Sequence, residues 1–177
     1  MKYKFLVLDI DGTVTNSKKE VTPKTLEAVV GLQKRGIPVA IASGRPVQGV
    51  SKVASVLRFQ DFGSYVLPFN GARILNFRTK ECIYSKTLPL HLPGRLVKDA
   101  RENGVGIITY EGDKIIAGTQ PDKYMQIEAD INNIPVVWEK KFETYVNFPV
   151  NKCLLTGDPV DLEALEPVLA QKYCHEA

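Results

Sequence analysis

The chain has few of the residues on which disulfides, zinc sites and histidine-based catalysis depend. Its 177 residues include three cysteines, two histidines and one tryptophan. Cys82, Cys153 and Cys174 are odd in number and form no C-x-x-C motif, so we expect reduced thiols in a cytoplasmic protein rather than disulfides. His91 and His175 are isolated from other ligand-type residues, which argues against a histidine-based zinc site or catalytic triad.

The sequence also lacks a long apolar run and a strong charge of either sign. The N-terminal apolar segment is interrupted at Asp9, too early for a signal peptide or a membrane span. The net charge of +3 comes without a dense Lys/Arg run, which argues against a nucleic-acid partner. We interpret Lys18-Lys19 as solvated surface. The length allows one substantial domain or two small ones.

Strand and helix patterns alternate in the N-terminal part. Thr22-Pro23 is a helix start, with Thr as N-cap and Pro in the first turn, and Gly36 ends that helix. The predicted order is a strand at 5–8, a helix at 23–35, a strand at 37–42, a helix at 47–57 and a strand at 65–67. This order predicts a parallel sheet with right-handed crossovers.

The pattern changes near Asn70-Gly71 to a mixture of hairpins and helices. We expect hairpins at 73–86 and 105–117, helices at 93–103 and 121–131, a strand at 153–156 and a last helix opened by Asp158-Pro159. In the helix at 121–131, Tyr124, Ile127 and Ile131 form the apolar stripe. The fold class is α/β, with a parallel-sheet domain at 1–73 and an α+β domain at 74–177.

The segment from Asp9 to Thr13 (Asp-Ile-Asp-Gly-Thr) carries the most functional information. Its simplest interpretation is a turn at a strand end, since Asp and Gly are common turn residues. A calcium loop is a second interpretation. It fails because Val14 occupies the position that needs glycine and because a strand, not a helix, precedes the loop.

Nucleophilic catalysis on a phosphate ester is the third interpretation. The carboxylate of Asp9 would attack phosphorus and form an aspartyl-phosphate. Asp11 would protonate the leaving alkoxide and later take a proton from the attacking water. Mg²⁺, held by Asp9 and Asp11, would offset the repulsion between these carboxylates and a phosphate dianion.

At these residues the chain resembles the haloacid dehalogenase-like hydrolases, whose first motif is D-x-D-G-T after a hydrophobic strand. Ser43, at the end of the second strand, fits the family's second motif, a Ser or Thr that binds the phosphoryl group. The run from Ile41 to Pro46 (Ile-Ala-Ser-Gly-Arg-Pro) and the Asn70-Gly71-Ala72 turn resemble its Cof-like subfamily. The resemblance implies a partial Rossmann-like core with an inserted α+β cap.

The resemblance also implies a substrate and a set of site residues. The substrate would be a small phosphorylated metabolite similar to a sugar phosphate. Asp9 and Asp11 would be the catalytic and metal-binding residues, and the phosphate-binding residues would be Gly12, Ser43, Gly44, Arg45 and Asn70. Ser43 also reads as the N-cap of the following helix, and both roles can hold together. Arg45 reads equally well as a surface charge.

Two further motifs of the family, a Lys and a late acidic pair, have no convincing match. The segment from Thr156 to Asp161 imitates the acidic motif, but Asp158 is better interpreted as a helix N-cap. We therefore expect half of a core followed by most of a cap, with an unpaired edge at the Asp-bearing strand. This predicts weak Mg²⁺ binding and little turnover. A phosphate- or partner-binding domain without turnover, and a phosphomutase-type phosphotransferase, stay open as alternatives.

Overall fold

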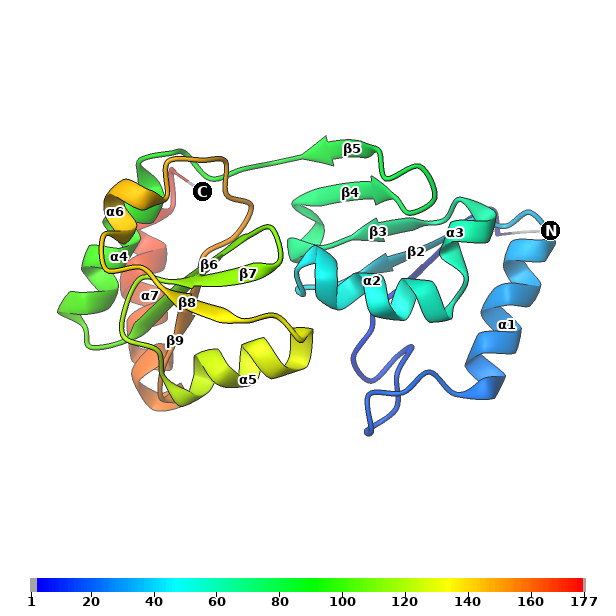
Figure 1. Cartoon of the computed structure of the whole chain (residues 1–177), viewed down its shortest axis with the longest axis horizontal. Helices are drawn as coiled ribbons and strands as arrows, with labels where there is room; N and C mark the ends of the chain where they lie inside the picture. The colour runs from blue at the N-terminus through cyan, green and yellow to red at the C-terminus, as the bar shows by residue number, and fades with distance from the viewer. Residues whose placement is uncertain (1–2, 177) are drawn as a thin grey trace. The chain divides into compact units, whose positions relative to one another are not determined.

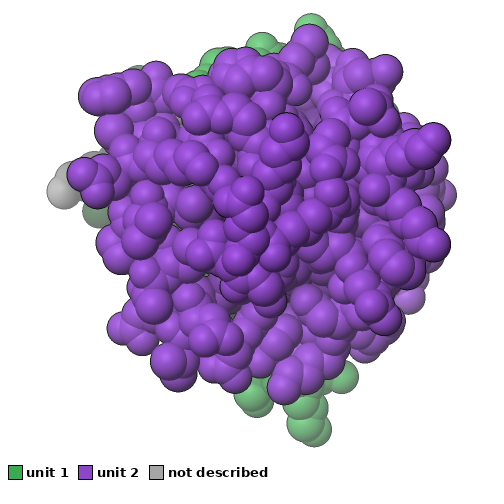
Figure 2. Space-filling model, turned by 90° about the vertical axis from the view of Figure 1, so that its left-hand side faces the viewer, with its two compact units in different colours: residues 1–86 green, residues 87–177 purple. Residues whose placement is uncertain are grey.

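The computed structural model describes residues 3–176, in two compact units that span residues 1–86 and 87–177 (Figure 1, Figure 2). The predicted boundary after residue 73 lies too early. The hairpin of β4 (Arg73–Asn76) and β5 (Cys82–Ser85) forms as predicted, but β4 pairs antiparallel with β3 (Tyr65–Leu67). The hairpin therefore extends the first sheet and belongs to the first unit.

The first unit is built on a five-stranded sheet with the order β1-β2-β3-β4-β5. As predicted, β1 (Leu6–Leu8), β2 (Val39–Ala42) and β3 run parallel. They are linked by α1 (Pro23–Lys34) and α2 (Val47–Val56). Right-handed crossovers that step in one direction across a sheet place both helices on the same face. Because the three strands run parallel, their carboxyl ends share one edge of the sheet.

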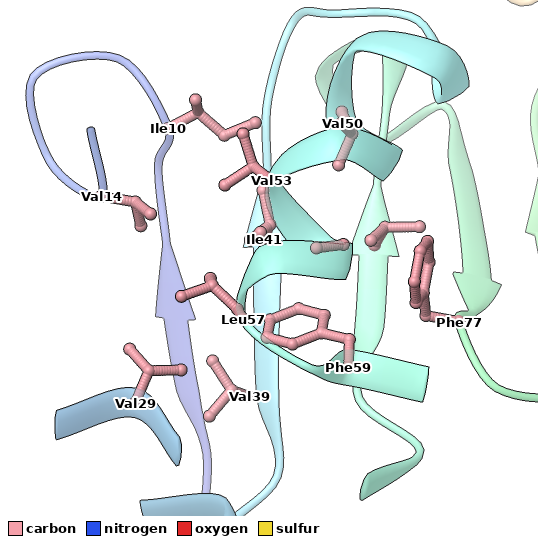
Figure 3. Close-up of a cluster of buried hydrophobic side chains, with 12 residues drawn as sticks. Ile10, Val14, Val29, Val39, Ile41, Val50, Val53, Leu57, Phe59 and Phe77 are labelled. Atoms are coloured by element: carbon pink, nitrogen blue, oxygen red, sulfur yellow. The ribbon is translucent and has the colours of Figure 1, made fainter. Parts of the chain in front are cut away.

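That covered face holds the core of the first unit. Side chains from β1, β2, β3, α1, α2 and α3 (Phe59–Phe62) meet in one buried cluster (Figure 3), which includes Ile10, Val14, Val29, Ile41, Val53, Leu57, Phe59 and Val66. On the opposite face Phe5 and Val7 stay 46% and 54% exposed. Within the described residues β1 pairs with β2 alone, so the predicted unpaired edge is confirmed.

The second unit has a four-stranded sheet with helices on both faces. The sheet order is β8 (Val136–Trp138), β7 (Lys114–Ala117), β6 (Gly106–Glu111) and β9 (Leu154–Thr156). Ile107 and Ile116 pack with α4 (Leu92–Glu102), α6 (Phe142–Tyr145) and α7 (Pro159–Tyr173). Ile108 and Ile115 point the other way, onto α5 (Lys123–Asn132). This alternation gives the unit two separate apolar layers.

One predicted helix buries a different stripe from the expected one. In α5, Ile127 and Ile131 are 53% and 43% exposed, whereas Met125 and Ala129 are buried. Met125 and Ala129 lie four residues apart and pack against the sheet, which turns the isoleucines outward. The short elements α3, α6 and β8 were not predicted. No helix within residues 3–176 is long and apolar enough to cross a membrane.

Asp99 ties α7 to α4 through two charge-assisted contacts. Its buried carboxylate accepts hydrogen bonds of 2.6 Å from Lys172 Nζ and from the hydroxyl of Tyr173. Burial alone would raise the pKa of Asp99, but these hydrogen bonds outweigh it and the pKa is lowered. A lowered pKa stabilises the fold above the ordinary Asp value near 3.8, and this contribution is lost as the pH falls through the folded pKa.

We predict that Asp99→Asn lowers the free energy of unfolding by about 2 kcal/mol at pH 7. The difference between wild type and variant should start to shrink below about pH 4, where the unfolded wild-type chain takes up a proton, and should vanish as the pH falls through the lowered folded pKa of Asp99. Urea unfolding across this pH range measures both values. A difference that is constant with pH would contradict the assignment.

Candidate active site

The turn after β1 presents two carboxylates around a buried isoleucine. Ile10 is fully buried in the core of the first unit, whereas Asp9 and Asp11 on either side of it are exposed. The carbonyl of Ile10 accepts hydrogen bonds of 2.9 Å from both the backbone N–H and the hydroxyl of Thr15. Gly12 has a φ of +77°, in the left-handed region that favours glycine. The core thus fixes the turn that carries both carboxylates.

The loops after β2 and β3 are joined by backbone hydrogen bonds. Asn70 N–H donates to the carbonyl of Ser43 (2.9 Å), and Phe69 N–H donates to the carbonyl of Arg45 (3.0 Å). Phe69 and Asn70 have φ values of +55° and +56°. This conformation is strained for phenylalanine, and such strain is often found at functional sites. The structure therefore brings Ser43, Arg45 and Asn70 together, and their role in phosphate binding stays a prediction.

Ser43 is not a helix N-cap, so that interpretation is wrong. The N-cap of α2 is Pro46, which makes no side-chain capping bond. Pro46 has an extended ψ of 169°, so the helical backbone begins only after it. Ser43 lies earlier, 7% exposed, and its Oγ accepts a hydrogen bond of 3.3 Å from Arg45 N–H.

Arg45 connects the two loops through its side chain. Its Nε and Nη2 donate to the two carboxylate oxygens of Asp11, at 3.0 and 2.7 Å. The Arg45 side chain is 13% exposed, so it is not the solvated surface charge that was one expectation. This bidentate pair is the largest cause of the lowered pKa of Asp11, and Lys19 adds to it.

Lys19 is a site residue that the sequence analysis missed. Its Nζ lies 2.7 Å from Asp11 Oδ1, although Lys18-Lys19 was interpreted as solvated surface. The side chain of Asn16 accepts hydrogen bonds from the N–H groups of Lys18 and Glu20, which closes a tight turn. Asn16 was the available signal, because asparagine favours such turns. The direction in which the turn projects Lys19 follows from the tertiary structure.

Asp9 differs from Asp11 in its surroundings. Its carboxylate is exposed, and it forms no hydrogen bond or ion pair with any residue between 3 and 176. In the same range, no three His, Cys, Asp or Glu side chains are grouped so that they could hold a metal. Asp158, in the second unit, accepts a hydrogen bond of 3.0 Å from Val160 N–H and caps α7, as predicted.

Comparisons with known proteins agree with the motifs. The profile of the haloacid dehalogenase-like hydrolase family matches residues 6–177. A Streptococcus pyogenes protein named "Putative phosphatase M6_Spy0533" is 28% identical over 98% of this chain and 64% of its own length. A haloacid dehalogenase-like hydrolase from Bacteroides thetaiotaomicron superposes with a TM-score of 0.91 and 38% identity, over 99% of this chain and 66% of that one.

A second similar structure is that of the subclass IIB sugar phosphatase BT4131. It has a TM-score of 0.74 and 25% identity, and the match covers 93% of this chain and 63% of that one. Bacillus subtilis "Putative phosphatase YxeH" matches over 86 residues, at 33% identity and 32% of its length. These matches thus cover between 32% and 66% of the length of the relatives.

We predict that Thr15→Val lowers the free energy of unfolding by about 1 kcal/mol, since it removes the buried hydrogen bond to the Ile10 carbonyl. Thr15→Ser keeps the hydroxyl and loses only the methyl group, so it is the control in which the hydrogen bond remains. Chemical denaturation of the three proteins compares them. A Thr15→Val variant as stable as the wild type would show that the hydroxyl does not hold the turn.

Proposed function

This chain belongs to the haloacid dehalogenase-like hydrolase family, and on that basis we propose that it carries the nucleophile and the acid/base of a Mg²⁺-dependent phosphohydrolase. One observation supports the proposal above the others. The Asp9–Asp11 turn and the Ser43–Arg45 loop follow adjacent parallel strands, and the Arg45–Asp11 ion pair joins them. Ligands of open α/β sheets bind at this edge. The resemblance of the motifs to the family and its Cof-like branch is confirmed.

The proposed reaction proceeds in two displacements. A carboxylate oxygen of Asp9 attacks phosphorus, the ester P–O bond breaks, and Asp11 protonates the leaving alkoxide. Water then attacks the phosphorus of the aspartyl-phosphate and gives a proton to Asp11, which releases inorganic phosphate and restores Asp9. The exposed, unpaired carboxylate of Asp9 is accessible for attack.

Phosphate recognition involves the loops after β1, β2 and β3 in this proposal. The Ser43 hydroxyl, the backbone of Gly12 and Gly44, the Arg45 guanidinium and the Asn70 side chain would contact the phosphoryl oxygens. A small phosphorylated metabolite, similar to a sugar phosphate, is the proposed substrate class. The similarity to a structure named as a sugar phosphatase supports this class. The roles of the first part of the chain as core and of the second as cap, which the sequence divided after residue 73, stay predictions; the compact units divide after residue 86.

Mg²⁺ suits the donors that the turn offers. It prefers oxygen ligands and commonly binds through one or two carboxylates plus phosphate oxygens and water, so Asp9 and Asp11 would hold it. When bound, it would offset the charge that accumulates between the carboxylates and the phosphate. The described residues supply only this pair, and Asp11 is already engaged by Arg45 and Lys19. Weak Mg²⁺ binding is therefore expected.

The shortage of metal ligands among the described residues also favours the second candidate function, phosphate binding without turnover. We predict that hydrolysis of p-nitrophenyl phosphate with Mg²⁺ stays below about 1 s⁻¹, the lower end of common kcat values. Any such activity should disappear in Asp9→Asn. Faster Mg²⁺-dependent hydrolysis that requires Asp9 would contradict the expected impairment but support the chemistry. Residual activity unchanged by Asp9→Asn would contradict the proposed nucleophile.

Asp158→Asn is the matched control for Asp9→Asn. It removes one carboxylate from the segment that imitates a late metal motif, and it should preserve the helix start because asparagine also caps helices well. We expect it to leave the Mg²⁺ dependence unchanged. Measuring free phosphate together with p-nitrophenol separates hydrolysis from transfer to another acceptor. Equal yields indicate a hydrolase, whereas a phosphate deficit indicates a phosphotransferase.

A further inference from the structure

The guanidinium of Arg45 is held in place before any substrate contact. Its backbone N–H donates to Ser43 Oγ (3.3 Å), and its carbonyl accepts from Phe69 N–H (3.0 Å). The side chain is 13% exposed, and it uses Nε and Nη2 to bind both oxygens of Asp11. Arg45 is therefore a fixed cation that presents one planar, two-donor edge.

The Asp11 carboxylate binds this edge of Arg45 with two oxygens, as a phosphate group can. Two parallel N–H···O bonds from one guanidinium fit two oxygens of either a carboxylate or a phosphate. Asp11 carries a single negative charge and its side chain is 40% exposed, so water screens this ion pair. A phosphate dianion carries about twice that charge at neutral pH and competes well for the same donors.

We propose that Asp11 occupies the phosphate-binding edge of Arg45, and that a phosphate dianion binds there by displacing the Asp11 carboxylate. This inference rests on the proposed function, in which phosphate binds at this loop. It gives Asp11 two positions: one on Arg45, and one next to the leaving oxygen after phosphate has taken its place. Lys19, 58% exposed and in contact with one oxygen of Asp11, would retain that carboxylate near the site.

The two carboxylates of the turn make the proposal testable by binding alone. Asp9→Asn and Asp11→Asn each remove one negative charge from the same turn, but only Asp11→Asn frees Arg45, because Asp9 has no ion pair within residues 3–176. A difference between the two variants that disappears without Arg45 therefore isolates the competition for Arg45 from the general loss of charge.

The experiment is a calorimetric titration of the full chain with inorganic phosphate, without divalent metal, at constant pH and ionic strength. We expect Asp11→Asn to bind phosphate about fivefold more tightly than Asp9→Asn, on the scale of a well-formed exposed ion pair. In an Arg45→Met background this advantage should vanish. Lys19→Met should change the ratio between the two Asp variants by less than about twofold.

Three results would overturn the proposal: equal affinities of Asp9→Asn and Asp11→Asn, an advantage that persists without Arg45, or no phosphate binding by any variant. If Arg45→Met does not fold, Arg45→Lys replaces it, since lysine retains the charge without the two-donor edge and should reduce the advantage. No turnover or metal is involved, so failure here is separate from failure of the Asp9 nucleophile in the hydrolysis assay.

Discussion

Parallel pairing of β1 with β2 is the constraint on which the candidate site depends. It puts the carboxyl ends of both strands at one edge, so the turn that follows β1 and the loop that follows β2 leave the sheet side by side. The buried side chain of Ile10 then anchors the turn in the core and leaves Asp9 and Asp11 outside it. The Arg45–Asp11 ion pair follows from this arrangement, since its partners are 34 residues apart in sequence.

The two carboxylates at this edge of the sheet differ in their charged partners. Asp11 is neutralised by Arg45 and Lys19, whereas the exposed carboxylate of Asp9 has no hydrogen bond or ion pair with residues 3–176. A nucleophile needs an accessible carboxylate, which Asp9 offers. A general acid must carry a proton, and the ion pairs that lower the pKa of Asp11 disfavour its protonation, so the proposed acid role requires the Asp11 carboxylate to leave Arg45.

Local signals predicted most of the elements correctly. The helix start at Thr22-Pro23, its stop at Gly36 and the N-cap at Asp158 all depend on nearby residues, and the structure contains each of them. Contacts between residues far apart in the sequence could not be predicted in the same way. Nothing near Asn70-Gly71 shows that the following hairpin extends the first sheet, and nothing near Lys19 shows that it contacts Asp11. Ile127 and Ile131 have helical spacing, yet the buried side of α5 carries Met125 and Ala129 instead.

The central claim, that Asp9 is the nucleophile, is tested most directly by trapping the phosphorylated residue. Asp11→Asn should slow hydrolysis of the intermediate, and p-nitrophenyl phosphate has a leaving group that needs no proton. After incubation with Mg²⁺, borohydride reduction converts an aspartyl-phosphate to homoserine, which peptide mass spectrometry locates. The account predicts homoserine at position 9. Homoserine at another position, or none at position 9 while p-nitrophenol is released, would contradict it.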